Sequence, residues 1–103
     1  MYQSLLKWDI YEISAQTSSL HGVKLRGRIR KFGIDHQRNI LAENTQDQEN
    51  QVRFAVPTGE NVSDLETFLL GVVPDCSVKQ VMVGVENPVL SKLLVNQVDR
   101  YQL

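Results

Sequence analysis

A chain of 103 residues is long enough for one domain, and we expect a single domain over residues 1–103. It is 42% hydrophobic and 22% charged, which is ordinary for a globular protein, and its net charge of −1 gives no general attraction to nucleic acid or membranes. The longest apolar run, Phe68 to Val73, is far too short to cross a membrane, and the first residues lack a secretory pattern, so we expect a cytoplasmic protein. The single cysteine, Cys76, excludes an internal disulfide framework.

The N-terminal part of the chain is predicted to form a strand followed by a loop. In residues 8–16, Tyr11, Ile13 and Ala15 alternate with polar residues, which is the pattern of a half-buried strand. Residues 17–25 are predicted to form the loop that leads from this strand into the first helix.

A first helix is predicted over residues 26–37. The helical spacing i, i+3, i+4, i+7 is supplied by Ile29, Phe32, Gly33 and His36. Glycine inside a helix costs about 1 kcal/mol relative to alanine, so Gly33 suggests close packing of the helix against the sheet. No glycine follows the helix, and Asn39 is the residue expected to supply a left-handed cap.

Two strands joined by a hairpin are predicted next, over residues 39–45 and 51–57, with the polar segment 46–50 as their connection. In the second of these strands, hydrophobic residues alternate with their neighbours. The alternating core positions are Val52, Phe54 and Val56, and the intervening residues are Gln51, Arg53 and Ala55.

A second helix is predicted to begin near Ser63. Ser63 and Glu66 have the spacing of a capping box, and Pro74 prevents the helix from continuing. Its predicted core stripe consists of Leu65, Phe68, Leu69 and Val72.

The C-terminal part is predicted to form a strand over residues 77–86, in which Val81, Val83 and Val85 alternate, and a last strand over residues 91–101. The resulting order is β-α-β-β-α-β with a further short C-terminal strand. This order predicts an α+β protein with the ferredoxin-like α/β plait, in which two helices lie on one face of an antiparallel sheet.

The segment between the first strand and the first helix is the most informative part of the sequence. A loop that enters a helix exposes unpaired N–H groups and the positive end of the helix dipole, which together favour an anion. Gly22 allows close approach of the backbone to a ligand, and Arg26 supplies planar donors suited to phosphate. The surrounding cluster of cations could steer anionic substrates or could simply be a solvated helix face. The cluster consists of Lys24, Arg26, Arg28, Arg30 and Lys31.

The same residues carry a family resemblance. The run Leu20-His21-Gly22-Val23-Lys24-Leu25-Arg26 resembles the acylphosphatase signature V-Q-G-V-x-F-R, and Asn44-Thr45, 18 residues after Arg26, is similar to the second signature of that family. The predicted second helix, Leu90 to Leu93 and Arg100-Tyr101 fall where the family has its second helix and closing strand, so the resemblance covers roughly residues 8–103. The chain departs from the family at Ser18, His21 and Leu25, where Gly, Gln and Phe are common, and these departures leave the turnover rate open.

The resemblance implies hydrolysis of carboxyl-phosphate bonds to carboxylate and phosphate, without metal or cofactor. It implies that Arg26 binds the phosphate, that Asn44 positions the attacking water, and that Thr45 orients Asn44 or lines the site. The remaining phosphate oxygens would be held by backbone N–H groups of the loop, from about Leu20 to Arg26, with Leu20, His21, Gly22, Val23, Lys24 and Leu25 as further binding residues.

This implied chemistry rests on positioning and charge stabilisation. Neither Arg nor Asn titrates near neutrality, so we expect activity that is almost flat from about pH 5 to 8. A sharp optimum in that range would instead implicate His21 or a carboxylate.

Other functions stay open. A non-catalytic module could keep the fold and the anion loop and bind a phosphorylated ligand, a protein or nucleic acid. Asn44 on a separate strand favours the enzyme, whereas Ser18 at the loop opening favours the module. A third function is action on a special acyl phosphate or carbamoyl phosphate, as in domains of larger maturation proteins, although the length of this chain argues against that context.

The expected partner is a small acyl phosphate or a similar anion, bound by a monomer. No cluster of His, Cys, Asp and Glu has metal-ligand spacing, so we expect no metal. Nucleic acid is disfavoured because the predicted strands lack the paired aromatic residues of an RNA-recognition motif.

Overall fold

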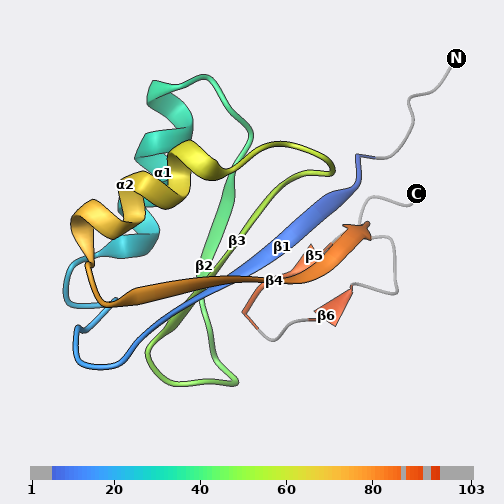
Figure 1. Ribbon diagram of the computed structural model, residues 1–103. Helices are drawn as coiled ribbons and strands as arrows, with labels where there is room; N and C mark the ends of the chain where they lie inside the picture. The colour runs from blue at the N-terminus through green and yellow to red at the C-terminus, as the bar shows by residue number, and fades with distance from the viewer. Residues whose placement is uncertain (1–5, 87, 92–93, 96–103) are drawn as a thin grey trace, which may run out of the picture.

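A computed structural model describes residues 6–86, 88–91 and 94–95 of the chain. In chain order its elements are β1 (Trp8–Ala15), α1 (Leu25–Asp35), β2 (Leu41–Asn44), β3 (Gln51–Pro57), α2 (Ser63–Val72), β4 (Cys76–Val85), β5 (Pro88–Val89) and β6 (Leu94–Val95). The first four strands form an antiparallel sheet in the order β2-β3-β1-β4, and β5 pairs with β6 separately (Figure 1). This α+β arrangement is compatible with the predicted plait. None of the helices in the described residues is long and apolar enough to span a membrane.

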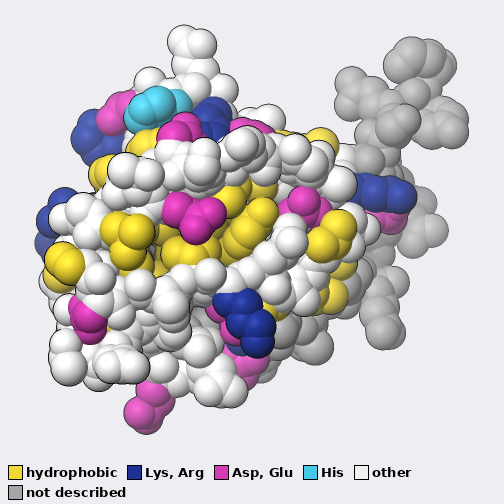
Figure 2. All heavy atoms as spheres, in the orientation of Figure 1, with side chains coloured by type: hydrophobic (Ala, Val, Ile, Leu, Met, Phe, Trp, Pro, Cys, Tyr) yellow, Lys and Arg dark blue, Asp and Glu magenta, His cyan; other side chains and the backbone are white. Residues whose placement is uncertain are grey.

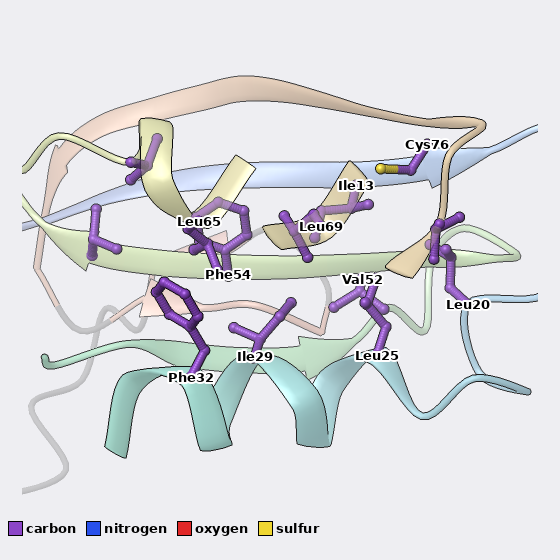
Figure 3. Close-up of a cluster of buried hydrophobic side chains, with 14 residues drawn as sticks. Ile13, Leu20, Leu25, Ile29, Phe32, Val52, Phe54, Leu65, Leu69 and Cys76 are labelled. Atoms are coloured by element: carbon purple, nitrogen blue, oxygen red, sulfur yellow. The ribbon is translucent and has the colours of Figure 1, made fainter. Parts of the chain in front are cut away.

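Both helices cover the same face of the sheet. The rings of Phe32 in α1 and Phe68 in α2 lie 5.0 Å apart, so the helices also touch each other. Figure 3 shows side chains from both helices and from the sheet pointing toward one another. The buried cluster includes the predicted strand positions Ile13, Val52, Phe54 and Val56 and the predicted helix positions Ile29, Phe32, Leu65 and Leu69. The hydrophobic alternation therefore predicted this face correctly.

The apolar layer is not closed everywhere. Phe68 and Val72 of α2, together with Tyr11 and Val78 on the sheet, are only partly buried. Figure 2 shows hydrophobic side chains reaching the surface in the centre of the face that carries α2, with acidic side chains among them.

The opposite face of the sheet has a different composition. A small cluster of Ile10, Ala55 and Leu90 is buried there, and beside it lies Arg53, which is only 1% exposed. The Arg53 Nε donates to Glu12 Oε2 at 2.8 Å, and its Nη1 donates to the Leu90 carbonyl oxygen at 2.9 Å and lies 2.9 Å from a carboxylate oxygen of Asp47. The segment that follows β5 thus covers this face and is tied to it by one arginine.

The end of α1 is capped two residues earlier than predicted. Gln37 has a φ of 54°, in the left-handed region, so the expectation that Asn39 supplies this conformation is wrong. The N–H of Arg38 donates to the Gly33 carbonyl at 2.8 Å and the N–H of Gln37 donates to the Ile34 carbonyl at 3.2 Å, which is the Schellman pattern. This reversal turns the chain toward β2 without a glycine.

Gly33 is closely packed, but against the α1–β2 connection rather than against the sheet as predicted. A Cβ at this position would lie 3.2 Å from the Arg38 carbonyl oxygen and 3.3 Å from the Cβ of Ile40. The Arg38 side chain links the α1–β2 connection to the start of α2, because its guanidinium lies 2.7 Å from Glu60, just before this helix, and 2.7 Å from Asp64 in its first turn. The hydrogen bond from Arg38 holds the pKa of Asp64 below its usual value, against the opposite effect of its desolvation.

The start of α2 lies where the sequence predicts it, but the capping box is absent. The cap position is Val62, and Ser63 is the first helical residue rather than the cap. The N–H of Ser63 donates instead to Asn61 Oδ1 at 2.8 Å, and the N–H of Glu66 donates to the Val62 carbonyl. The side chain that binds the first N–H of the helix therefore comes from Asn61, two residues upstream of the Ser63 position that the capping box assigns.

β4 is irregular, and this changes the face on which its valines lie. Ile10 pairs with Met82 whereas Tyr11 pairs with Gln80, so Val81 is an extra residue in the register. Val81 packs against the Ile10 cluster, but Val83 is 63% exposed, so the predicted alternation of valines is interrupted.

The predicted last strand, residues 91–101, is mostly outside the described residues, as is the Arg100-Tyr101 pair. Within the described part, Ser91 lies in a turn and β6 covers Leu94–Val95, so the strand begins later than predicted.

Candidate functional site

A small pocket lies where the start of α1 meets the end of β2. Its volume is about 350 Å³, and its lining residues are His21, Lys24, Arg26, Gly27 and Asn44. It therefore brings together the two residues for which the sequence predicts catalytic roles, Arg26 and Asn44. Figure 1 shows that the β1–α1 loop, the β2–β3 connection and the α2–β4 turn all lie at this end of the molecule.

Asn44 reaches the pocket because of its place in β2. It is paired with Val52 of β3, whose side chain belongs to the buried cluster under the helices, so Asn44 lies on the helix-covered face as well. The side chain is half-buried, and within the described residues it makes no side-chain hydrogen bond. Its amide is therefore available to a ligand or to water.

Arg26 is held only loosely. Its side chain is 45% exposed, and its Nη1 lies 3.8 Å from Glu43 Oε2, beyond hydrogen-bond distance. Arg30, one turn further along α1, approaches the same carboxylate to 3.1 Å and also donates to the Ala42 carbonyl at 2.9 Å. Arg30 is the closer partner of the Glu43 carboxylate. The Arg26 side chain can therefore turn toward an anion while Arg30 still balances the charge of Glu43.

The start of α1 adds backbone donors. Lys24 precedes the helix in the left-handed conformation, with a φ of 57°, and no side chain caps the first turn. The N–H of Arg28 donates back to the Lys24 carbonyl at 3.1 Å, whereas the N–H groups of Arg26 and Gly27 have no acceptor among the described residues. These two donors and the positive end of the helix dipole are therefore available beside the Arg26 side chain.

Most of the loop amides predicted to bind phosphate are already used within the protein. Ser19 accepts two of them, through its carbonyl and its hydroxyl, and the carbonyls of Leu20 and His21 accept two more at 3.1 and 3.0 Å. The amides engaged in this way are those of Leu20, Gly22, Val23, Lys24 and Leu25. Among the predicted loop amides, those of His21 and Arg26 have no acceptor in the described residues. The side chains of Leu20 and Leu25 are fully buried and point into the core (Figure 3).

The opening of the loop is anchored by a carboxylate that the sequence analysis missed. The Asp75 carboxylate accepts the N–H groups of Thr17 and Ser18 at 2.9 and 3.1 Å and the hydroxyls of both residues. These hydrogen bonds, that of the Ser18 hydroxyl first, hold the pKa of Asp75 well below its usual range. Ser18, which departs from the glycine common in acylphosphatases, therefore has a specific structural partner here.

Thr45 lies beside the pocket rather than in it. It is buried, and its hydroxyl donates within the β2–β3 connection, to the carbonyls of Gln48 and of Gln51, the latter at 3.1 Å. Thr45 lines a larger groove of about 840 Å³ along the edge of β2, which shares Arg26 and Asn44 with the small pocket. The structure thus places Thr45 where it shapes the hairpin behind Asn44.

His21 lines the pocket together with Arg26 and Asn44, whereas Cys76 does not line it. Burial, with a smaller effect of Asp75, raises the pKa of the Cys76 thiol, so the thiolate is disfavoured. Among the residues that the structure describes, no group of His, Cys, Asp and Glu is arranged to hold a metal ion.

No protein-family model, curated protein or solved structure matches the chain, so the geometry of the site carries the functional argument.

Proposed function

We propose that this chain is a cytoplasmic acylphosphatase with the ferredoxin-like plait, which hydrolyses carboxyl-phosphate bonds without a metal. The observation that carries the proposal is that Arg26 and Asn44 line one small pocket at the start of a helix. The strand order β2-β3-β1-β4 and the placement of both helices on one face support the fold.

Binding would use the donors that remain open at the pocket. Phosphate oxygens would accept hydrogen bonds from the Arg26 guanidinium and from the N–H groups of Arg26 and Gly27, where the helix dipole also favours negative charge. Lys24 at the rim would add a long-range attraction for the anion.

Asn44 would orient a water molecule for attack on phosphorus. The new bond forms between the water oxygen and phosphorus, the bond between phosphorus and the acyl oxygen breaks, and its electron pair leaves on the carboxylate. The water proton passes to the phosphate product. A carboxylate is a stable leaving group and needs no general acid, so positioning and charge stabilisation are the main contributions of the protein.

Hydrolysis of benzoyl phosphate in EDTA tests this proposal directly. We expect wild-type turnover, and we expect Arg26→Ala and Asn44→Ala each to lower kcat/KM by about 100-fold or more, as for the loss of one donor to a developing charge. Lys31→Ala removes a helix cation paired with Asp35, and Asn39→Ala removes an exposed amide; both serve as matched controls that should leave the rate unchanged. Turnover that is indifferent to Arg26 would contradict the proposal.

A non-catalytic anion-binding module is the second candidate function. It is favoured by the loop amides that are already engaged within the protein and by the carboxylate of Glu43 near Arg26. This function predicts that inorganic phosphate binds, that Arg26→Ala abolishes binding, and that no acyl phosphate is hydrolysed.

A further inference from the structure

Asn50 makes an unusual set of contacts at the end of the β2–β3 connection. Its Oδ1 accepts the N–H of Leu20 at 2.9 Å, and its Nδ2 donates to the carbonyls of Ser18 at 2.8 Å and Ala15 at 3.3 Å. The residue is half-buried and has a φ of 53°, in the left-handed region. One side chain thus fixes the β1–α1 loop at three backbone groups.

These contacts extend to both residues of the proposed catalytic pair. On one side, the Leu20 carbonyl accepts the N–H of Leu25 at 3.1 Å, and Leu25 is the first residue of α1, directly before Arg26. On the other side, Asn50 directly precedes β3, which pairs with β2 up to Asn44. Asn50 therefore joins the loop that leads to Arg26, through its side chain, to the start of the strand that pairs with the Asn44 strand.

We infer that Asn50 is a positioning residue of this site, which sets the placement of Asn44 relative to the phosphate held by Arg26. The inference rests on the proposed acylphosphatase function. Asp75 anchors the loop at Thr17 and Ser18 only and has no hydrogen bond to the β2–β3 connection, so it does not duplicate this role.

Asn50→Gly is the informative variant, because glycine adopts the left-handed conformation without strain while the three side-chain hydrogen bonds are lost. We expect kcat for benzoyl phosphate to fall about tenfold or more, since small displacements of reacting groups are costly. The inhibition constant of inorganic phosphate should change by no more than about threefold, because Arg26 and the donors at the helix start remain. A merely structural role would not separate these two quantities.

Asn61→Gly is the matched control. Asn61 is also a loop asparagine, and its side chain accepts a backbone N–H, that of Ser63, at the start of α2 and outside the pocket. We expect this variant to lose some thermal stability while kcat stays within about twofold of wild type. Asn50→Asp keeps an acceptor for the Leu20 N–H but loses the donors to Ser18 and Ala15, so its kcat should lie between those of wild type and Asn50→Gly.

Each outcome has a separate meaning. If Arg26→Ala abolishes hydrolysis but Asn50→Gly behaves like Asn61→Gly, the inference is overturned and the proposed function stands. If kcat and phosphate affinity fall in parallel in Asn50→Gly, the role is structural and the inference is again overturned. If the folded wild type does not hydrolyse benzoyl phosphate, the proposed function fails and the inference fails with it.

Discussion

The two faces of the four-stranded sheet are buried by different means. The face under α1 and α2 is closed by hydrophobic side chains from both helices and from all four strands of the sheet, among them Ile13, Phe54, Ile29 and Leu65. The opposite face has only a small apolar cluster, and beside it Arg53 is buried with its guanidinium bound to two carboxylates and to the Leu90 carbonyl. Apolar burial needs only a repeated pattern, whereas a buried charge needs specific partners at specific distances.

This difference also bears on where the site can lie. The candidate pocket opens at the end of the helix-covered face, where the apolar core stops and backbone N–H groups at the start of α1 begin. Arg53, the most buried cation among the described residues, is paired on the other face and is not available to a ligand. Arg53 is buried and paired, which indicates a structural role. Arg26 is exposed and only loosely held, which leaves it available to a ligand.

The largest expected effect comes from breaking the helix-covered face. Phe54 is fully buried and stacks on Tyr11 with ring centroids 4.9 Å apart. Phe54→Ala should lower the free energy of unfolding by about 4 kcal/mol, because it removes apolar contacts and leaves a cavity. Urea denaturation measures this value, and Val83→Ala on the exposed surface of β4 is the control, with an expected change below about 0.5 kcal/mol. Similar losses in both variants would contradict the described core.

A smaller loss is expected on the opposite face. Arg53→Met should lower the free energy of unfolding by about 2 kcal/mol, less than for a fully buried pair, since Glu12 and Asp47 keep some contact with water. Adding Glu12→Gln should restore part of the loss by removing the uncompensated carboxylate. If the single variant is as stable as wild type, the ion pairs do not hold this face.

Acid should distinguish the two faces further. Hydrogen bonding from Arg53 lowers the pKa of Asp47 below its usual value, against a smaller effect of desolvation. A carboxylate with a lowered folded-state pKa stabilises the fold at pH values above its unfolded pKa of about 3.9, and this contribution disappears as the pH falls through the folded pKa. Urea midpoints measured from pH 5 down to pH 2 should therefore fall more steeply for wild type than for Arg53→Met. Parallel curves would contradict the coupling between Asp47 and Arg53.

The smallest expected effect is a gain, and it lies in the helix layer. Gln37 holds a left-handed conformation that glycine adopts without strain, so Gln37→Gly should raise the free energy of unfolding by about 0.5 kcal/mol. Asn39→Gly, at the position that the sequence suggested for this cap, should give no gain. Thermal unfolding of the two variants decides between them, and a gain in Asn39→Gly alone would contradict the observed cap.

Hydrophobic periodicity predicted the core under the helices because it reports directly on which side chains avoid water. Val52, Phe54 and Val56 on β3 and Leu65 and Leu69 on α2 were found in this way. The prediction from periodicity failed in β4, where the strand does not keep a regular two-residue alternation of its side chains. The extra residue Val81 in β4 shifts the face of the following residues, and no feature of the local sequence marks it.

The candidate site was predicted in part. The spacing of Arg26 and Asn44 and the resemblance of their surroundings suggested a shared site, and the structure places both residues in one pocket. The loop amides were expected to be open, but most of them donate within the protein. Sequence patterns do not show which donors are already satisfied, since the acceptor of the Leu20 amide, Asn50, is 30 residues away.

By itself, the sequence determined the order of both helices and the first four strands, the hydrophobic face of the sheet and the position of the loop and cationic cluster at the start of the first helix. These properties depend on neighbouring residues and on short periods, which are present in the chain before it folds. Only the tertiary structure decided that Arg53 is buried and Arg26 is not, that Asp75 and Asn50 anchor the loop, and that the open donors lie at Arg26 and Gly27. Each of these depends on contacts between segments far apart in the sequence, where distance and direction select the partner of each polar group.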